Sequence, residues 1–292
     1  MDIRVPYVIA AVVLVIGAAP AHAQTRAAGV PSCELPHAPG VSVQRLVSGQ
    51  RPRAYRLFVP PAYDGRPRLP LVLDLHGSGG TAAGQARNSG LETLGAGEGF
   101  IVATLEAEDG LWNVPVQTNR ADDVAYVRDV IAHVAARVCT DETRVYATGF
   151  SGGGRMTSLL GCRLGSQIAA IAPVAGLRLP GASCDGPVPV LTFHGLADAQ
   201  NPYDGHAPGR GADWLESVPE ALAGWARHNA CTGSVRLEDE PGPLSTLRYD
   251  GCRDGTEVRM IRVDGLGHTW TRREIDTTAV MWQFFRSHRL RR

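Results

Sequence analysis

The sequence predicts an α/β fold, a single domain with a mostly parallel central sheet covered by helices on both faces. Two observations lead to this prediction. Short, nearly continuous apolar runs recur along the 292-residue chain, and such runs are typical of strands that are buried on both faces. Between the runs lie segments in which apolar residues recur at helical spacing. Strands that alternate with helices in this way form parallel sheets.

The first half of the chain contains three expected strands and one helix. Residues 53–59 alternate between polar and apolar side chains and stop at a proline pair, which predicts a half-buried strand. The apolar runs 69–75 and 100–105 predict buried central strands. The pair Asp122-Asp123 then precedes apolar residues at helical spacing up to residue 138. We therefore expect a helix there with an aspartate at its N-terminus.

The second half continues the alternation. Residues 144–148 predict a strand that runs into a glycine-rich turn at residues 149–154, and a helix is expected after that turn. Three more buried strands are predicted at residues 168–174, 188–193 and 258–263. Helices are expected at residues 219–228 and around the apolar face formed by Val280, Met281, Phe284 and Phe285.

The chain shows no internal repeat, low-complexity tract or linker to an appended module. We therefore expect residues 24–52 to form an N-terminal extension and first segment, and residues 53–292 to form the one domain that carries the chemistry. The chain has 29 Lys plus Arg against 29 Asp plus Glu, which gives a formal net charge of +0. Proteins that bind nucleic acid need a basic surface, so we expect no nucleic-acid partner.

The first residues have the pattern of an export signal. Arg4 precedes an apolar run from Val8 to Ala19, and the small residues Ala21 and Ala23 then form a site for signal peptidase. The run is shorter than the roughly 20 residues that span a bilayer. We therefore expect residues 1–23 to be a signal peptide, and the mature chain to be secreted to the periplasm or the extracellular space without membrane insertion.

Export makes disulfide bonds the expected state of the cysteines, because exported proteins meet oxidising conditions. The spacing contains neither a C-x-x-C pair nor a cysteine-histidine zinc pattern, so metal binding is not expected. The residues alone leave the pairing open. The six cysteines are Cys33, Cys139, Cys162, Cys184, Cys231 and Cys252.

Residues 149–153 fit the pattern G-x-S-x-G, with Ser151 at its centre. In the sequence strand, sharp turn, helix, this pattern places a serine hydroxyl at the C-terminal edge of the sheet, and small flanking residues allow the strand and the helix to pass closely. Serine is too weakly acidic to attack an ester unaided, so a histidine base and a carboxylate must follow it. Ser151 is the expected nucleophile.

The acid and the base are expected after later strands, because open α/β sheets gather their sites at the C-terminal ends of strands. Asp198 lies just past the strand at 188–193, and His268 lies just past the last strand. Asp204 and Asp213 are the alternatives for the acid, and His194 is the alternative for the base, although we expect His194 to brace its own loop.

The oxyanion hole needs two backbone amides directed at the developing negative charge. We expect one from Gly152, directly after the nucleophile, and one from Ser78, in the loop after the strand at 69–75. We expect His76 to hold that loop in place. The stretch from Gly77 to Ala82 also fits a dinucleotide-binding pattern, but no acidic residue ends a strand at the expected distance of ~20 residues.

Two tryptophans follow expected strands. Trp112 comes after the strand at 100–105, and Trp270 comes two residues after the proposed base. We expect both to line the mouth of the substrate pocket. The alternative is that each is an ordinary buried tryptophan.

With these residues assembled, the chain resembles the secreted esterase family that groups polyhydroxybutyrate depolymerase-like proteins with feruloyl and acetylxylan esterases. The resemblance covers most of the chain after the signal. It implies an α/β-hydrolase fold with Ser151, Asp198 and His268 as the triad. The matching stretches lie at residues 75–77, 121–124, 144–156, 193–198, 202–203, 217–219 and 267–270.

The family pattern also implies three disulfides, Cys231 with Cys252, Cys162 with Cys184, and Cys33 with Cys139. The chain departs from the family in three ways. Many relatives carry a cysteine-containing loop where this chain has residues 113–116, and proline often stands at the position of Thr271. The surface-binding module of depolymerases that act on solid polymer is absent.

The resemblance implies a secreted serine esterase that acts through an acyl-enzyme, most of all on polyhydroxybutyrate-type oligomers or related polyesters. A feruloyl or acetylxylan esterase that acts on plant cell-wall polysaccharide is the first alternative. A peptidase or acyltransferase would use the same triad, and a non-catalytic binding protein would normally lose one of its members. The reaction needs no metal and no cofactor, and we expect a monomer whose partner is its ester substrate.

Overall fold

The computed structural model describes residues 1–2, 33–179, 184–205, 216–240 and 242–291. The expected signal peptide at residues 1–23 lies outside these ranges except for its first two residues. Cys33–Arg292 form one compact unit. Its start precedes residue 53, where the sequence analysis placed the beginning of the domain, because residues 40–48 form a strand of the same sheet.

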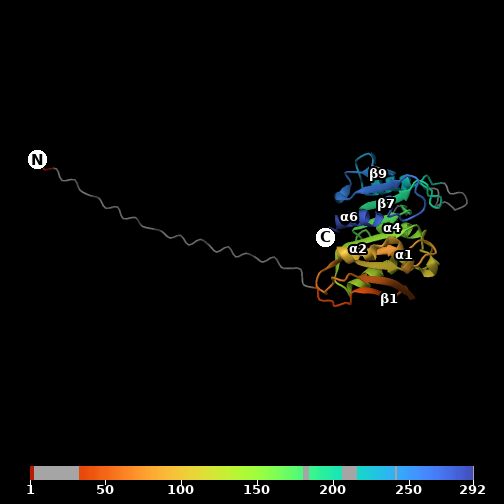
Figure 1. The fold of residues 1–292 in the computed structure, drawn as a ribbon, viewed down its shortest axis with the longest axis horizontal. Helices are drawn as coiled ribbons and strands as arrows, with labels where there is room; N and C mark the ends of the chain where they lie inside the picture. The colour runs from red at the N-terminus through yellow and green to blue at the C-terminus, as the bar shows by residue number, and fades with distance from the viewer. Residues whose placement is uncertain (3–32, 180–183, 206–215, 241, 292) are drawn as a thin grey trace. The chain divides into compact units, whose positions relative to one another are not determined.

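The strands of the described residues form one sheet in the order β1-β2-β4-β3-β5-β6-β7-β10-β9-β8. Figure 1 shows β1 at the lower edge of the compact unit and β9 near the upper edge. The bounds are β1 (Gly40–Ser48), β2 (Arg51–Val59), β3 (Leu69–Leu75), β4 (Ile101–Leu105), β5 (Thr140–Phe150), β6 (Ala170–Val174), β7 (Val190–Gly195), β8 (Arg236–Asp239), β9 (Leu244–Tyr249) and β10 (Val258–Val263).

The centre of the sheet is parallel and its two ends are antiparallel. Strands β4, β3, β5, β6, β7 and β10 run in one direction. Strands β1 and β2 at one end, and β9 and β8 at the other, pair in antiparallel fashion. The predicted α/β fold with a mostly parallel sheet is therefore confirmed, and each of the predicted strands is present.

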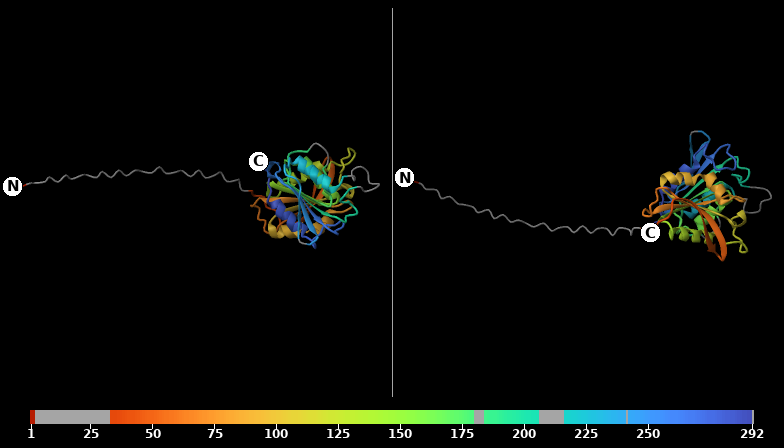
Figure 2. Two further views of the ribbon diagram at one scale, coloured as in Figure 1. Left: turned by 90° about the horizontal axis from the view of Figure 1, so that it is seen from above. Right: turned by 60° about the horizontal axis from the view of Figure 1, so that its bottom comes forward.

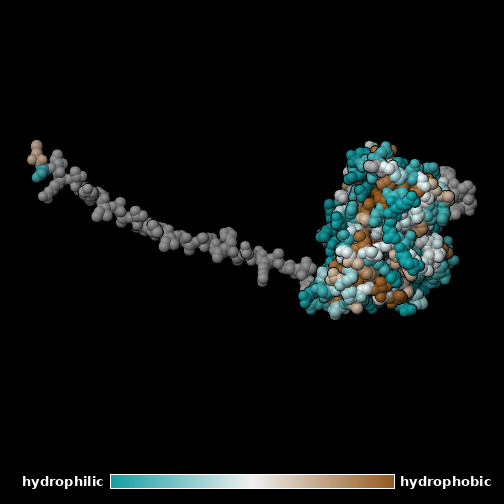
Figure 3. Space-filling view, viewed as in Figure 1, coloured by the Kyte–Doolittle hydropathy of each residue, from teal (hydrophilic) through white to brown (hydrophobic). Residues whose placement is uncertain are grey.

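Strands β1, β8 and β9 were not predicted. Strand β1 is an edge strand on which Val41, Val43 and Val47 are exposed. The alternation of apolar and polar residues in its sequence therefore does not mark a buried face. Figure 3 shows hydrophobic residues over the lower part of the compact unit, where Figure 1 places this strand. All four residues of β8 are exposed, and its sequence Arg-Leu-Glu-Asp has no apolar pattern to detect.

Helices cover both faces of the sheet, as Figure 2 shows. Apolar side chains of α3 (Asp123–Ala135), α4 (Gly152–Arg163) and α5 (Val218–His228) form one core with the sheet. Those of α2 (Leu91–Glu98) and α6 (Thr277–Arg286) form a second core on the other face, where α1 (Ala82–Ser89) also lies. No helix in the described part of the chain is long and apolar enough to span a bilayer.

Strand β3 shows how the two cores share the sheet. Leu71, Leu73 and Leu75 belong to the core with α3, α4 and α5, whereas Val72 belongs to the core with α6. Successive side chains of a strand point to opposite faces, so a strand covered on both faces is apolar at nearly every position. This is the reason that the continuous apolar runs of the sequence mark central strands.

Side chains cap the N-termini of α3 and α5, and the aspartate that the sequence analysis expected at the start of α3 is one of them. Asp122 is the N-cap of α3, and its carboxylate accepts a hydrogen bond from the Ala125 amide. Ser217 caps α5 in a capping box, in which Ser217 Oγ and the carboxylate of Glu220 each accept a backbone N–H of the other residue. Such caps satisfy amides that have no partner within the helix.

Three disulfide bonds connect segments of the compact unit. They join the same pairs that the family resemblance implies, Cys33 with Cys139, Cys162 with Cys184, and Cys231 with Cys252. The first has a sequence separation of 106 residues and ties the beginning of the compact unit to the residue before β5. Bonds of this kind are typical of proteins that fold in oxidising compartments.

Asp74 is a fully buried acid on β3. Its carboxyl group accepts hydrogen bonds of 2.7 Å from Gln85 Nε2 and Ser89 Oγ, both on α1. Burial raises the pKa of Asp74 from 3.8 to about 7, although these two hydrogen bonds act in the opposite direction. The folded protein therefore keeps this proton over a pH range in which the unfolded chain has lost it.

We expect the effect of Asp74→Asn on the free energy of unfolding to be more favourable at pH 8 than at pH 5. The difference between the two pH values should be about 1–3 kcal/mol. Between pH 4 and pH 7 the folded state binds more protons at this site than the unfolded state, so the wild-type free energy of unfolding decreases as the pH rises. Urea unfolding of both proteins at the two pH values measures the difference. Asp239→Asn on the exposed strand β8 is the control, and equal effects of the two variants would contradict the prediction.

Candidate active site

The three residues predicted to form a triad lie at one edge of the sheet. Ser151 follows β5, Asp198 follows β7 and His268 follows β10. Strands β5, β6, β7 and β10 are parallel neighbours, so their C-terminal ends lie side by side. This is the edge at which open α/β sheets place their sites.

Ser151 occupies a sharp turn between β5 and α4. Its φ of 54° and ψ of −113° are unusual for a residue with a side chain. The turn is held because the Ser151 amide donates to Val174 O at 2.9 Å and Ser151 O accepts from the Arg155 amide at 3.0 Å. Strained backbone of this kind persists only where the surroundings hold it, and it is common at functional sites.

The glycines beside Ser151 are required by close packing. A Cβ atom at Gly149 would lie 2.6 Å from the carbonyl carbon of Gly153 and 2.7 Å from Leu75 O. A Cβ atom at Gly153 would overlap Leu75 O and lie 2.6 Å from His76 O. The G-x-S-x-G pattern therefore reflects a place where β5, the first turn of α4 and the end of β3 touch through their backbones.

Asp198 and His268 form a direct pair. His268 Nδ1 lies 2.7 Å from Asp198 Oδ2. A carboxylate can only accept a hydrogen bond, so Nδ1 carries the proton and Nε2 is left as the basic nitrogen. The His268 ring lies 4.8 Å from the ring of Phe150, the residue before Ser151, which places the imidazole beside the turn.

The environment keeps Asp198 ionised. Burial by itself would raise the pKa of this carboxyl, but the hydrogen bonds from His268 and from the Asn201 amide lower it below its usual range. Its second oxygen accepts from the amides of Asn201 at 2.8 Å and Gln200 at 2.9 Å. Both carboxylate oxygens are thus held, and the pair with His268 has a defined geometry.

Two of the alternatives for the acid and the base, Asp204 and His194, lie among the described residues. Asp204 is exposed, and Asp213 lies outside the described residues. His194 is buried, its Nε2–H donates to Asn201 O at 2.8 Å, and Asp198 Oδ2 lies 3.6 Å away. Burial lowers the pKa of His194, so it is neutral at physiological pH. It braces the loop that carries Asp198, as the sequence analysis expected.

The loop after β3 lies against the Ser151 turn. A Cβ atom at Gly77 would lie 3.4 Å from Ser151 Cβ, and one at Gly152 would lie 3.0 Å from the Ser78 amide nitrogen and overlap Ser78 Oγ. Ser78 Oγ also accepts a hydrogen bond from Arg155 Nη2 at 3.3 Å. The amides proposed for the oxyanion hole, those of Ser78 and Gly152, therefore border Ser151.

His76 holds this loop, as predicted. Its Nδ1–H donates to Gly77 O at 2.7 Å and its Nε2 accepts from the Ala107 amide at 3.0 Å. Both ring nitrogens are used and the side chain is buried. The glycine-rich stretch that fits a dinucleotide pattern is thus part of the same loop beside Ser151.

Both tryptophans proposed for the pocket mouth are nearly buried. Trp112 is 3% exposed and its Nε1–H donates to His76 O at 2.8 Å. Trp270 is 5% exposed, packs in the core with α6, and donates to Thr278 Oγ1 at 3.0 Å. Their contact with substrate stays a prediction, and the structure gives each a packing role. For Trp112 that role is to support the loop after β3.

Sequence reasoning missed the residues on β2 and in the segment between β4 and α3 that support this edge of the sheet. Arg53, Glu106 and Asn113 make buried or partly buried polar contacts there, and only Asp123 had drawn attention, as one of a pair at a helix N-terminus. In the described part of the chain, no three histidine, cysteine or acidic side chains are grouped in a way that could hold a metal ion.

Comparison with known proteins places the chain among esterases. No model of a known protein family matches it. NocK of Nocardia uniformis subsp. tsuyamanensis, a protein named as an esterase, is 34% identical over 255 residues, which cover 78% of this chain and 74% of NocK. A probable feruloyl esterase C of Aspergillus clavatus is 31% identical over 219 residues, 70% of this chain and 77% of that protein. The chain belongs to this family of esterases.

A further relative of the esterase is feruloyl esterase B of Piromyces equi, 30% identical over 226 residues. The match covers 72% of the esterase but 41% of that longer protein. Among solved structures, an acetyl xylan esterase from Aspergillus awamori has a TM-score of 0.61 at 16% identity, covering 84% of this chain and 98% of that chain. The esterase has the α/β-hydrolase fold, and it is an ester hydrolase.

We expect Asp198→Asn to lower kcat/KM by about 10³- to 10⁴-fold, because an amide at this position no longer stabilises a protonated His268 or holds its tautomer. Initial rates on p-nitrophenyl acetate measure the effect, and thermal unfolding checks that the variant is folded. The matched control is Asp204→Asn, an exposed aspartate of the same loop, for which we expect rates near wild type. Similar losses in both variants would contradict the assignment.

Proposed function

We propose that the esterase is a serine hydrolase that cleaves carboxylic esters through Ser151, His268 and Asp198. The observation that carries this proposal is the 2.7 Å contact between His268 Nδ1 and Asp198 Oδ2 at the sheet edge where Ser151 occupies its strained turn. A serine, a carboxylate and an imidazole in this order along the chain are the groups that acyl transfer on this fold requires.

In the proposed reaction, Ser151 Oγ attacks the ester carbonyl carbon while His268 Nε2 takes the hydroxyl proton. A bond forms between Ser151 Oγ and the carbonyl carbon, and the carbonyl oxygen becomes an oxyanion. His268 then gives the proton to the leaving alcohol as its C–O bond breaks, and an acyl-enzyme remains. Water attacks the acyl-enzyme by the same route and releases the acid and free Ser151. Asp198 stabilises the imidazolium that forms in each step.

The amides of Ser78 and Gly152 are the proposed donors to the oxyanion. Both border Ser151, and Gly152 begins α4. The first amides of a helix have no partner within the helix and carry a partial positive charge. Donors that are held in place before the reaction stabilise the transition state without reorganisation.

We expect Ser151→Ala to abolish hydrolysis of p-nitrophenyl acetate and covalent labelling by a fluorophosphonate, because no other hydroxyl would occupy the turn. The loss of rate should exceed about 10³-fold. Ser166→Ala, at an exposed serine beyond the C-terminal end of the same helix, is the control and should keep both activities. Unchanged hydrolysis in Ser151→Ala would refute the proposal.

The substrate proposed first is a feruloyl or acetyl ester of a plant cell-wall polysaccharide. It is supported by the names of the relatives, which include feruloyl esterases and a bifunctional acetylxylan esterase/xylanase from Neocallimastix patriciarum that is 27% identical over 219 residues. Polyhydroxybutyrate-type oligomers, which the sequence analysis placed first, have no such support and become the second candidate. A peptidase or acyltransferase would use the same triad.

The esterase is further proposed to be secreted and to act as a monomer. The pattern of residues 1–23 and the three disulfides support export into an oxidising compartment.

We expect kcat/KM on methyl ferulate or acetylated xylan to exceed that on a hydroxybutyrate oligomer by at least about tenfold, an order that pocket contacts can produce. Product release from each substrate, with tributyrin as a general ester and a peptide amide as the peptidase control, measures the order. Preference for the hydroxybutyrate oligomer would restore the second candidate to first place.

A further inference from the structure

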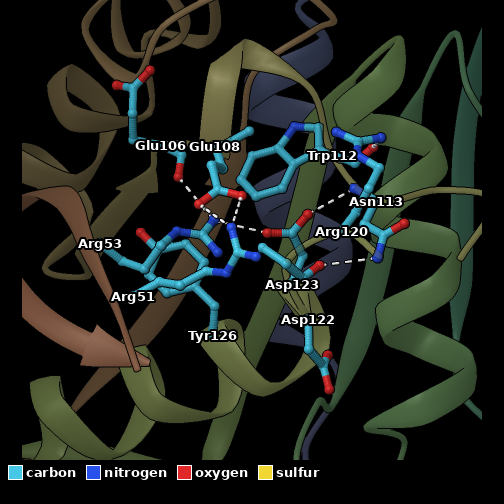
Figure 4. A network of polar contacts seen from close by, with 12 residues as sticks. Arg51, Arg53, Glu106, Glu108, Trp112, Asn113, Arg120, Asp122, Asp123 and Tyr126 are labelled. Atoms are coloured by element: carbon cyan, nitrogen blue, oxygen red, sulfur yellow. Dashed lines mark hydrogen bonds and ion pairs between the residues drawn. The ribbon is translucent and has the colours of Figure 1, made fainter. Parts of the chain in front are cut away.

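A buried ion pair lies behind the active-site edge, between β2 and α3. Arg53 Nη2 lies 2.8 Å from Asp123 Oδ1, and the two side chains are 4% and 2% exposed. Figure 4 shows the pair at the centre of a network of polar contacts. Removing two charges from water costs several kcal/mol, and apolar residues of similar volume often stabilise a fold as well or better. The pair is therefore weak evidence of stabilisation, and the contacts that it makes with its surroundings are more informative.

The guanidinium of Arg53 is held from several sides. Its Nη2 also donates to Glu106 O at 3.2 Å, and its central carbon lies 3.8 Å from the centroid of the Tyr126 ring. The Tyr126 hydroxyl in turn donates to Ala54 O at 2.6 Å, on the strand that carries Arg53. These contacts fix the orientation of the guanidinium, which connects β2 to α3 and to the residue after β4.

The carboxylate of Asp123 joins the arginine to the segment after β4. While Oδ1 pairs with Arg53, Oδ2 accepts a hydrogen bond of 2.7 Å from the Asn113 amide. The Asn113 side chain closes its own loop, because Nδ2 donates to Ala121 O at 2.9 Å and Oδ1 accepts from the Gln117 amide at 2.8 Å. Asp123 therefore fixes the backbone directly after Trp112.

Two arms lead from Arg53 to His76. In one arm, Asp123 holds the Asn113 amide, and the neighbouring Trp112 donates to His76 O at 2.8 Å. In the other arm, Arg53 holds Glu106 O, and the amide of the next residue, Ala107, donates to His76 Nε2 at 3.0 Å. His76 begins the loop that contains Ser78, the proposed donor to the oxyanion.

We propose that the Arg53–Asp123 pair positions the oxyanion loop, residues 76–79, relative to Ser151. Arg53 and Asp123 are positioning residues, because they act through Trp112, Ala107 and His76 and do not reach the substrate. The kinetic consequence rests on the proposed function, since it requires that the Ser78 amide stabilises an oxyanion. The structural consequence, a loop that loosens when the pair is lost, does not depend on it.

A second ion pair on the same elements offers a comparison. Arg51, two residues before Arg53 on β2, pairs with Glu108 at 2.8 Å, and the side chains are 47% and 33% exposed. Exposed pairs contribute little to stability. In the described residues the Glu108 carboxylate bonds to Arg51, whereas the contact that leads from Glu108 toward Trp112 is made by its backbone oxygen, which accepts a hydrogen bond from the Leu111 amide at 3.1 Å. Arg51→Met therefore removes an arginine of the same strand while leaving both arms intact.

The test compares Arg53→Met, Arg53→Lys and Arg51→Met. Arg53→Met leaves Asp123 buried without its partner and can fail to fold. Arg53→Lys keeps the charge but loses the planar contact with Tyr126 and the second hydrogen bond, so it provides a folded variant. Hydrogen exchange followed by mass spectrometry reports on peptides that cover residues 76–80 and 107–113, and kcat and KM are measured on p-nitrophenyl acetate well below the unfolding temperature.

Both Arg53 variants should exchange at least about tenfold faster in these two peptides, and kcat should decrease by about tenfold or more while KM stays within about twofold. A role in stability alone would change the unfolding temperature without this separation of kcat from KM. Three results would each overturn the proposal: Arg53 variants whose loop exchanges at the wild-type rate, a decrease in kcat without faster exchange, or changes of equal size in Arg51→Met.

Absence of ester hydrolysis by the wild-type protein would refute the proposed function. The exchange rates of the variants would still decide whether the Arg53–Asp123 pair positions the loop.

Discussion

The active-site edge depends on one close backbone contact, between the end of β3 and the turn that carries Ser151. The carbonyl oxygen of Leu75 lies so close to Gly149 and Gly153 that a Cβ atom at either residue would collide with it. The chain that continues from Leu75 is the loop of His76, Gly77 and Ser78. The same contact therefore sets the position of the proposed nucleophile and of the proposed oxyanion amide, and a methyl group there would displace both. Interiors packed to this density leave no room for even one extra carbon.

Around this contact, several buried polar groups use all of their hydrogen-bonding atoms, whereas His194 Nδ1 and Asn201 Oδ1 have no hydrogen-bond partner among the described residues. Both nitrogens of His76, both oxygens of Asp198 and both oxygens of Asp123 have partners. An unpaired polar group in such surroundings is costly, whereas a fully paired network admits a single arrangement. A site assembled in this way has its dipoles in place before substrate arrives, which is the condition for electrostatic catalysis.

The sequence predicted the centre of the fold well and its ends poorly. Residues 69–75 are apolar at nearly every position because helices cover both faces of β3, and that pattern is visible without a structure. Strand β1 exposes valines at its edge, and the exposed β8 lacks any apolar pattern, so neither gave a signal. Ser151, Asp198 and His268 could be proposed because each follows a predicted strand. Arg53 could not, since nothing near it in the sequence marks it as a partner of Asp123.

By itself, the sequence determined the alternation of strands and helices, the turn at Ser151 and the candidates for an acid and a base. These features depend on residues within a few positions of one another, so a local pattern is sufficient to reveal them. Only the tertiary structure decided which groups meet. Asp198 and His268 are 70 residues apart, and so are Arg53 and Asp123. Their contacts follow from the order of strands in the sheet, which brings distant segments to one edge and which no local pattern encodes.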